Sequence, residues 1–361
     1  MLRSKLILPR MKERITRTTQ PVIKETPLTG ISKIRKTNAP TKGLNLEKGT
    51  AAEKTFFHHR SKHRGQYDFT ELIKVHAALK AHVRPNKYGT ESVDFADPNA
   101  VKELNTSILK LHYGVKYWDI PEGYLCPPIP SRADYIHHIA DLFADFKPAE
   151  KLKLKCLDIG SGANCIYPLI GALEYGWSFI ASEIDSEALQ NMETIIAKNK
   201  GLEKKVTTRL QETPSQIFKG VLKKSEKIDA VICNPPFHES ALAASKANRR
   251  KSKNLGLGKD GQKAVLNFGG RPTELWTFGG EKKFIHTMIT ESVEYAKNIM
   301  WFTTLVSKKE SLNPIRKALD KVNPAQVKTI KMNQGNKSGR VLAWTFMDKE
   351  AQELWAAKRF K

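Results

Sequence analysis

The alternation of apolar runs with amphipathic stretches, which begins near residue 153, restricts the fold of this chain more than any other feature. Four short apolar runs fit buried strands, and they span residues 154–160, 178–185, 205–211 and 227–234. Segments 164–176 and 186–201, which lie between the first three runs, have helical spacing and end at glycine. Strands that alternate with helices form a parallel, doubly wound sheet, because their crossovers are long and right-handed. The sequence therefore predicts an α/β fold.

The end of the chain predicts a different connection between strands. A fifth apolar run covers residues 297–307, and two more follow at 326–336 and 340–347. Only a short segment, with Lys337-Ser338-Gly339 as the expected turn, separates the last two runs. A connection this short joins antiparallel strands, so we expect a closing hairpin.

Composition divides the chain into three parts. Residues 1–64 contain sixteen Lys and Arg against four Glu and keep no hydrophobic period, so we expect a disordered basic arm. Residues 65–150 are expected to form a small helical module, and residues 151–361 the α/β domain. The helices predicted in the module span residues 69–83, 97–114 and 131–146. The Arg-rich start also fits a mitochondrial transit peptide or a true start at Met11, and these alternatives stay open.

The net charge of the chain favours a polyanionic partner. The chain has 61 Lys and Arg against 37 Asp and Glu, a net charge of +24. Nucleic acid is the usual partner of such an excess. We expect a basic substrate loop at residues 244–270, and its candidate RNA contacts are Lys246, Arg249, Arg250, Lys251 and Lys253. Beyond this loop, Trp276 and Phe278 fit either stacking on flanking bases or a place in the core, and Glu281 is expected to support the pocket.

Several classes of protein and of site are disfavoured by the composition. No apolar run approaches the length of a membrane helix, so no membrane partner is expected. The four cysteines form no C-x-x-C pair, which disfavours zinc knuckles and disulfides and favours the cytoplasm. Three histidines lie in residues 58–67, but no carboxylate or cysteine completes a ligand set there. We therefore expect no metal site, and we expect this stretch to face RNA.

A glycine-rich turn indicates where a ligand binds. Asp158, Gly160 and Gly162 stand where the first strand becomes a helix, and glycines there allow a ligand to approach the backbone. Glu183 ends the next strand, where an acidic side chain can accept both hydroxyls of a ribose. Cys165 occupies the position of the third glycine of a pyrophosphate site, which disfavours NAD. A nucleoside without phosphates fits better, and S-adenosylmethionine is such a ligand.

The corner that follows the fourth strand indicates the chemistry. It consists of Asn234, Pro235, Pro236 and Phe237, at the carboxyl edge where open α/β sheets bind ligands. The Asn234 side-chain oxygen and the Pro235 carbonyl can accept hydrogen bonds from an exocyclic amine, which would favour a pyramidal and more nucleophilic nitrogen. Phe237 would stack on the base, which must first leave any helical stack. These residues are the catalytic candidates for methyl transfer to an aromatic amine.

The motifs LDIGSGANCIYPLIG, ASEID and CNPPF, in this order, resemble the class I amino-methyltransferases with an N-P-P-aromatic motif. Within that class the chain is similar to the ribosomal large subunit methyltransferase F family, relatives of methyltransferase-like protein 16, over roughly residues 54–350. The resemblance implies a Rossmann-like, seven-stranded sheet with a C-terminal antiparallel hairpin. It also implies S-adenosylmethionine as cofactor and the N6 amino group of a 23S rRNA adenine as substrate.

The resemblance also implies which residues bind the cofactor. An arginine before the first strand of the domain binds the methionine carboxylate in this family, and Arg132 occupies that position. The implied cofactor contacts are Arg132, Asp158, Gly160, Ser161, Gly162, Asn164, Glu183, Thr213 and Asn234.

Three other functions stay open at this point. The nucleophile could be a glutamine of a release factor, although such enzymes usually carry Tyr where Phe237 stands, or it could be a DNA adenine. The chain could also be a catalytically silent RNA-binding assembly factor, which the intact motifs disfavour. The expected partner is 23S rRNA, free or in a particle, and we expect a monomer.

Overall fold

The computed structural model describes residues 54, 56–238, 240, 274, 277–334 and 337–360. Residues 1–53 of the predicted basic arm and the whole of the predicted loop 244–270 lie outside the described residues. Among the described residues, no helix is long and apolar enough to span a bilayer.

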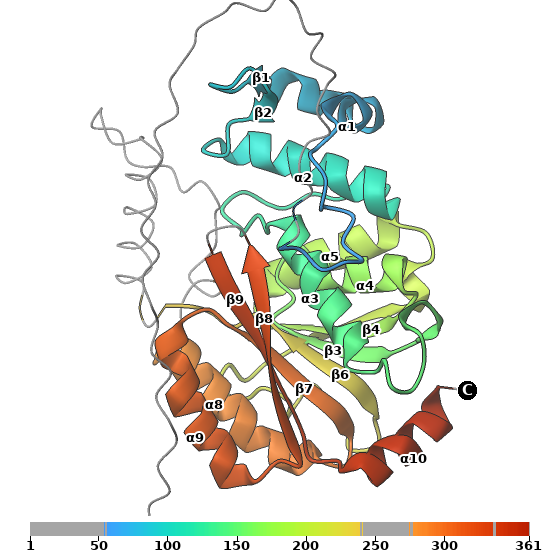
Figure 1. Ribbon diagram of the computed structural model, residues 1–361, viewed down its shortest axis with the longest axis vertical. Coiled ribbons are helices and arrows are strands. Elements are labelled where there is room, and N and C mark those ends of the chain that lie inside the picture. Colours follow the sequence, from blue (N-terminus) through green and yellow to red (C-terminus); the bar gives the residue numbers. More distant parts are fainter. Residues whose placement is uncertain are drawn as a thin grey trace, which may run out of the picture. The chain divides into compact units, whose positions relative to one another are not determined.

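A mixed seven-stranded sheet organises the domain, with the strand order β5-β4-β3-β6-β7-β9-β8 (Figure 1). Strands β3, β4, β5, β6 and β7 are parallel to one another, whereas β9 is antiparallel to both β7 and β8. The strand bounds are β3 Lys155–Ile159, β4 Ser178–Glu183, β5 Val206–Leu210, β6 Ile228–Cys233, β7 Ile299–Val306, β8 Gln326–Gln334 and β9 Lys337–Thr345. All seven predicted strands and the antiparallel hairpin are confirmed.

The turn of the closing hairpin lies earlier than predicted. The register pairs Gln334 with Lys337 and Asn333 with Ser338, so residues 337–339 belong to strand β9. The prediction of a turn at Lys337-Ser338-Gly339 was therefore wrong. A two-residue connection is the commonest hairpin loop, and it lets both strands extend further than a three-residue turn allows.

Alternate residues along the strands face two hydrophobic cores. On β6, Ala230 and Ile232 pack into one core, while Val231 and Cys233 pack into the other. The first core is covered by helices α2 to α5, and α8 and α9 cover the second (Figure 1). The bounds of these helices are α2 Pro98–Tyr113, α3 Ile129–Asp141, α4 Ile166–Glu174, α5 Ser186–Lys198, α8 Gly280–Ser292 and α9 Leu312–Val322. Short 3-10 turns lie at η2 Ala149–Lys151, η3 Leu202–Lys204, η4 Val293–Tyr295 and η5 Lys309–Ser311.

The helical module departs from its prediction at two helices. The helix predicted at residues 131–146 is α3, which ends at Asp141, five residues earlier than predicted. Helix α1 (Phe69–Val75) ends early, the 3-10 turn η1 (Ala77–His82) follows, and β1 (Val83–Pro85) and β2 (Glu91–Val93) form an unpredicted hairpin. The expected single helix 69–83 is interrupted at His76, whose ring contacts Glu103 and Lys110 of α2. Helix α2 starts after Asp97 and ends at Gly114 as predicted.

The helical module and the sheet, which lie on either side of residue 150 in the sequence, share one hydrophobic core. One hydrophobic core includes Phe69, Leu109 and Ile136 of the helical module together with Phe179 and Trp301 of the sheet. Residues Thr50–Lys361 accordingly form one compact unit, which joins the two parts that the sequence separated.

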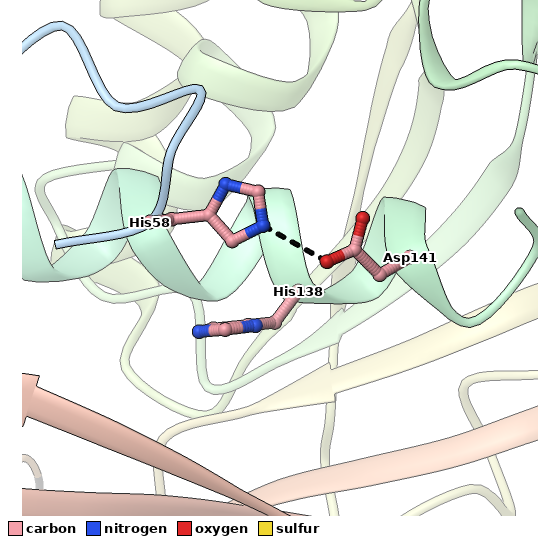
Figure 2. Close-up of side chains that lie close together, drawn as sticks. All are labelled: His58, His138 and Asp141. Carbon is pink, nitrogen blue, oxygen red and sulfur yellow. Dashed lines mark hydrogen bonds and ion pairs between the residues drawn. The ribbon is translucent and has the colours of Figure 1, made fainter.

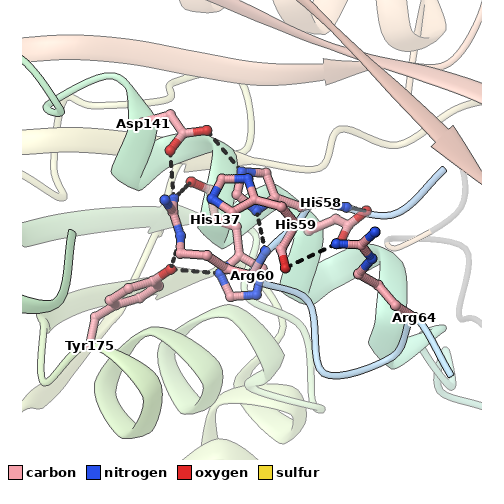
Figure 3. Close-up of polar contacts among 8 residues, drawn as sticks. His58, His59, Arg60, Arg64, His137, Asp141 and Tyr175 are labelled. Carbon is pink, nitrogen blue, oxygen red and sulfur yellow. Dashed lines mark hydrogen bonds and ion pairs between the residues drawn. The ribbon is translucent and has the colours of Figure 1, made fainter. Parts of the chain in front are cut away.

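The last part of the predicted arm, residues 56–64, packs on the domain rather than being disordered. His58 is 8% exposed, and its Nε2 lies 2.8 Å from Oδ2 of Asp141 on α3 (Figure 3). The Arg60 guanidinium donates to Asp141 Oδ1 at 2.6 Å, and its Nε donates to the Tyr175 hydroxyl at 3.0 Å. These partners are distant in sequence, which is why composition alone assigned the segment to the arm.

A buried aspartate joins the final helix to the sheet. Asp229 on β6 is fully buried and accepts hydrogen bonds from the Lys155 backbone N–H at 2.7 Å and from Trp355 Nε1 at 2.8 Å. Arg359 of α10 (Lys349–Arg359) donates to both of its carboxylate oxygens. The one charged residue within this apolar strand is therefore a structural anchor.

Candidate active site

A cavity of about 370 Å³ opens where β3, β4, β5 and β6 end. Its walls combine the glycine-rich turn after β3, the acidic end of β4 and the Asn-Pro-Pro corner after β6. This is the carboxyl edge of the parallel strands, the usual ligand position in open α/β sheets.

The glycine-rich turn forms a cradle that a side chain would fill. Gly160 and Gly162 have φ angles of +67° and +65°, a region that L-residues with side chains rarely adopt. A Cβ on Gly162 would lie 3.1 Å from the Asn164 Nδ2 and 3.2 Å from an oxygen of Glu274. The backbone there stays open to a ligand because these positions are glycine.

Glu183 lies at the end of β4 and is held by the backbone around it. Its Oε2 accepts from the Gly162 N–H at 2.8 Å, and its Oε1 accepts from Ile184 and Asp185 at 2.8 and 3.2 Å. Burial raises the pKa of Glu183, and the three backbone N–H groups oppose that rise. The carboxylate is thereby fixed in one orientation, and Oε2, which accepts only one of the three bonds, keeps a lone pair for a ligand hydroxyl.

A buried arginine forms another part of the cavity wall. Arg132 on α3 lines the cavity, is 9% exposed, and its guanidinium lies 5.7 Å from the centre of the Tyr167 ring. Among the described residues, no carboxylate lies within ion-pair distance of Arg132. A buried guanidinium without a carboxylate partner is suited to a ligand carboxylate.

Asp158, by contrast, lies behind the cavity wall. It is fully buried, and neither of its carboxylate oxygens has a hydrogen-bond partner among the described residues. Burial raises the pKa of Asp158 to about 7, opposed by the nearby Ser161 hydroxyl and by the positive charge of Arg132.

The Asn-Pro-Pro corner places a free acceptor at the cavity. Asn234 lines the cavity, and its Oδ1 is buried with no hydrogen-bond partner among the residues that the structure describes. Hydrogen bonds hold the backbone just before this corner. The Tyr135 hydroxyl accepts from the Cys233 N–H at 3.4 Å and contacts Thr303 Oγ1 at 2.7 Å. A buried acceptor without a partner is costly, so the amide is suited to a ligand N–H.

Most of the predicted site residues come together in this cavity. It is lined by Arg132, Gly160, Ser161, Gly162, Asn164, Glu183, Asn234 and Pro236. Four predicted residues do not line it: Asp158, Thr213, Pro235 and Phe237. Thr213 is exposed, and the neighbouring Gln211 and Pro214 form that part of the wall instead. The predicted RNA contacts Lys246, Arg249, Arg250, Lys251 and Lys253 lie outside the described residues.

Several lining residues were not predicted as part of the cofactor site, among them Glu274, Phe278 and Phe284. Glu274 accepts a hydrogen bond from the Leu125 N–H at 2.9 Å at the cavity wall. Phe278 and Phe284 line the cavity near the start of α8. Only Phe278 had a sequence signal, as an aromatic residue just before a pair of glycines. Glu281 does not line the cavity, because its carboxylate accepts from Ser307 N–H and Ser311 Oγ instead.

One histidine cluster has the residue types of a metal site. His58, His138 and Asp141 bring ligand-type atoms within 4.8 Å of one another (Figure 2). The Arg60 N–H donates to Nδ1 of His58, so Nε2 of that ring carries the proton and donates to Asp141. The other oxygen of Asp141 is bound by a guanidinium. A protonated Nε2 cannot ligate a cation, and the arrangement suits a structural contact better.

Comparison with known proteins shows which family the chain belongs to. Residues 51–348 match the family described as RNA methyltransferase. The chain is 46% identical to the ribosomal RNA large subunit methyltransferase F of Shewanella pealeana over 90% of this chain and 91% of the relative. It is 48% identical to the protein of that name from Serratia proteamaculans, over 88% and 96% of the two chains.

Solved structures are also similar. The hMettl16 catalytic domain in complex with the MAT2A 3'UTR hairpin 1 superposes with a TM-score of 0.69 at 30% identity, over 81% of this chain and 96% of that one. The N-terminal domain of human METTL16 in complex with SAH gives a TM-score of 0.64 at 29% identity, over 81% and 99%.

Proposed function

The chain belongs to the RNA methyltransferase family and, within it, to the ribosomal RNA large subunit methyltransferase F proteins, and from this premise we propose its reaction and substrate. It is an S-adenosylmethionine-dependent methyltransferase of ribosomal RNA, and the methylated atom is N6 of an adenine in 23S rRNA. The observation that carries this proposal is the buried, unpartnered Oδ1 of Asn234 at the cavity.

The residues of the cavity fit S-adenosylmethionine by their chemistry. Arg132 would bind the carboxylate of the methionine part, and Glu183 the ribose hydroxyls. The open space beside Gly160 leaves room for the cofactor to lie against the turn. When bound, this cofactor supplies an electrophilic methyl group on a sulfonium centre.

The protein's own contribution is to orient and activate the base. An adenine amino group is a weak nucleophile, because its lone pair is delocalised into the ring. Asn234 Oδ1 would accept a hydrogen bond from that amino group, and the Pro235 carbonyl, whose residue does not line the cavity in this structure, would turn toward the base to accept a second. The two acceptors favour a pyramidal nitrogen, and the rigid corner holds it in place, which reduces the entropic part of the barrier.

An in vitro assay with labelled S-adenosylmethionine tests the proposal directly. The protein is incubated in parallel with protein-free 23S rRNA, ribosomal particles, DNA and a release factor, and the labelled product is digested and identified. We expect label on adenine N6 of rRNA. Label only on protein would support a glutamine methyltransferase instead, label only on DNA a DNA methyltransferase, and RNA binding without any transfer an assembly factor.

A further inference from the structure

We propose that Phe278, Lys282 and Lys283 form a rim that holds the RNA strand next to the target adenine, with the aromatic ring stacked on a flanking base and the lysines on phosphates. We call these three residues the α8 rim. The proposal rests on the proposed function and adds a substrate-positioning surface to it.

Phe278 is the most exposed large hydrophobic residue of the described chain, with 85% of its surface exposed. It also lines the cavity that contains Asn234, so its ring lies at the cavity mouth. The preceding residue, Thr277, donates its backbone N–H to the His238 carbonyl at 3.1 Å, which ties this segment to the Asn-Pro-Pro corner. An aromatic ring held at the mouth of a base pocket, with most of its surface in solvent, is suited to stack on a second base.

The turn that follows Phe278 leads into α8, whose first turn carries Lys282 and Lys283. Gly279 and Gly280 have φ angles of +76° and +61°, and the chain then enters α8. A second hollow, of about 380 Å³, is lined by Gly279, Lys282, Lys283 and His286 of this segment and by Pro314 and Ile315 of α9. Both lysines are exposed. The acidic residue of this helical turn, Glu281, is 2% exposed and bound to Ser307 and Ser311, so it does not neutralise the hollow.

The chemistry of this surface fits single-stranded nucleic acid. A strand whose target base enters the cavity must run across the mouth, and the α8 rim offers it one stacking platform and two cations in sequence. The net charge of +24 favours the same partner. An exposed phenylalanine also suits a protein contact, and the experiment distinguishes that outcome.

The test uses the full-length protein and a single-stranded RNA oligonucleotide that contains an unpaired adenine. Dissociation constants are measured for wild type, Phe278→Ala, Phe278→Tyr and the double variant Lys282→Ala/Lys283→Ala at several salt concentrations. Lys321→Ala, an exposed lysine on α9, is the matched control. Binding of S-adenosylmethionine by each variant, measured by calorimetry, checks that the cavity is intact.

Replacing the aromatic ring and replacing the two lysines should change RNA binding in different ways. Phe278→Ala weakens RNA binding by about 5- to 100-fold at unchanged salt dependence, whereas Phe278→Tyr keeps most of the affinity. In a plot of log affinity against log salt concentration, the slope is negative. In the double lysine variant the slope becomes less steep, by about 0.7 for each phosphate that the protein no longer neutralises. Lys321→Ala and cofactor binding stay at wild-type values.

Two results would overturn the proposal. If Phe278→Ala binds RNA as tightly as wild type does, and wild type still methylates rRNA, the α8 rim proposal is wrong and the proposed function is kept. In that case, a protein partner that binds wild type but not Phe278→Ala would assign the ring to a protein contact. If wild type neither binds the oligonucleotide nor methylates any rRNA, both proposals fail.

Discussion

At the scale of single residues, the central observation is an amide oxygen without a partner. Buried polar atoms are nearly always hydrogen-bonded, because an unmet acceptor costs about 1–3 kcal/mol. Asn234 Oδ1 is such an acceptor among the described residues, and Asn234 is one of the residues that line the cavity. A ligand N–H would remove that cost, which connects the residue to binding rather than to folding.

Replacement of Asn234 by alanine tests this connection. We expect the turnover number to fall by at least about 100-fold, as it does when a preorganised hydrogen-bonding group is removed from other active sites. Binding of S-adenosylmethionine should stay measurable, and the ligand-free variant should be at least as stable as wild type, because the substitution removes a buried acceptor that has no partner within the described protein. Full activity in the variant would remove Asn234 from the mechanism.

The buried carboxyl of Asp158 predicts a pH dependence of stability. Burial raises its pKa to about 7 from the model-peptide value of 3.8, so the folded state favours the protonated acid. This contribution to stability is present below about pH 4 and is lost as pH rises through about 7. Asp158→Asn cannot ionise, so it should be more stable than wild type at pH 8, with a difference that shrinks toward pH 4.

Urea unfolding of the ligand-free protein at pH 5 and pH 8 measures this difference. Asp320→Ala, an exposed residue of α9, serves as the control and should show the wild-type pH profile. A variant less stable than wild type at pH 8 would show that the ionised carboxylate is stabilised in the fold, contrary to the expectation.

At the scale of elements, helix α10 is joined to the sheet through Asp229, which binds both Trp355 and Arg359 of the helix. Asp229 is fully buried and binds Arg359 through both oxygens, while the Arg359 side chain keeps 29% of its surface exposed. Asp229→Ala should lower the free energy of unfolding by about 3 kcal/mol, near the low end for a broken buried pair, because the guanidinium can still reach water. Urea unfolding measures the loss, and a change within about 0.5 kcal/mol would show that α10 is not anchored there.

Sequence patterns predicted elements best where local rules decide the structure. The seven strands and the caps of α2 at Asp97 and Gly114 follow from periodicity and from capping preferences. The break at His76 was missed because it depends on Glu103 and Lys110, which lie on another helix.

The same distinction applies to the site. Gly160, Glu183 and Asn234 were predicted because each follows a strand at a recognisable spacing, and parallel strands end at one edge. Glu274 and the exposed position of Phe278 were not predictable, since both depend on how a distant segment returns to the cavity. His58 and Arg60 were assigned to the arm because their partners lie about 80 residues further along the chain, for example 83 residues between His58 and Asp141.

At the scale of the whole molecule, one compact unit combines the helical module and the sheet, and the chain carries a net charge of +24. The module supplies Arg132 to the cavity, and the sheet supplies the glycine-rich turn, Glu183 and Asn234. The excess of positive charge strengthens attraction to RNA phosphates at low salt, so affinity for rRNA should fall as the salt concentration rises.

Mass spectrometry of 23S rRNA nucleosides tests the central claim most directly. The rRNA is isolated from cells that contain the protein, from cells that lack it, and from cells that carry Asn234→Ala. We predict that one N6-methyladenosine is present in the first and absent from the other two. An unchanged N6-methyladenosine content in all three would contradict the account.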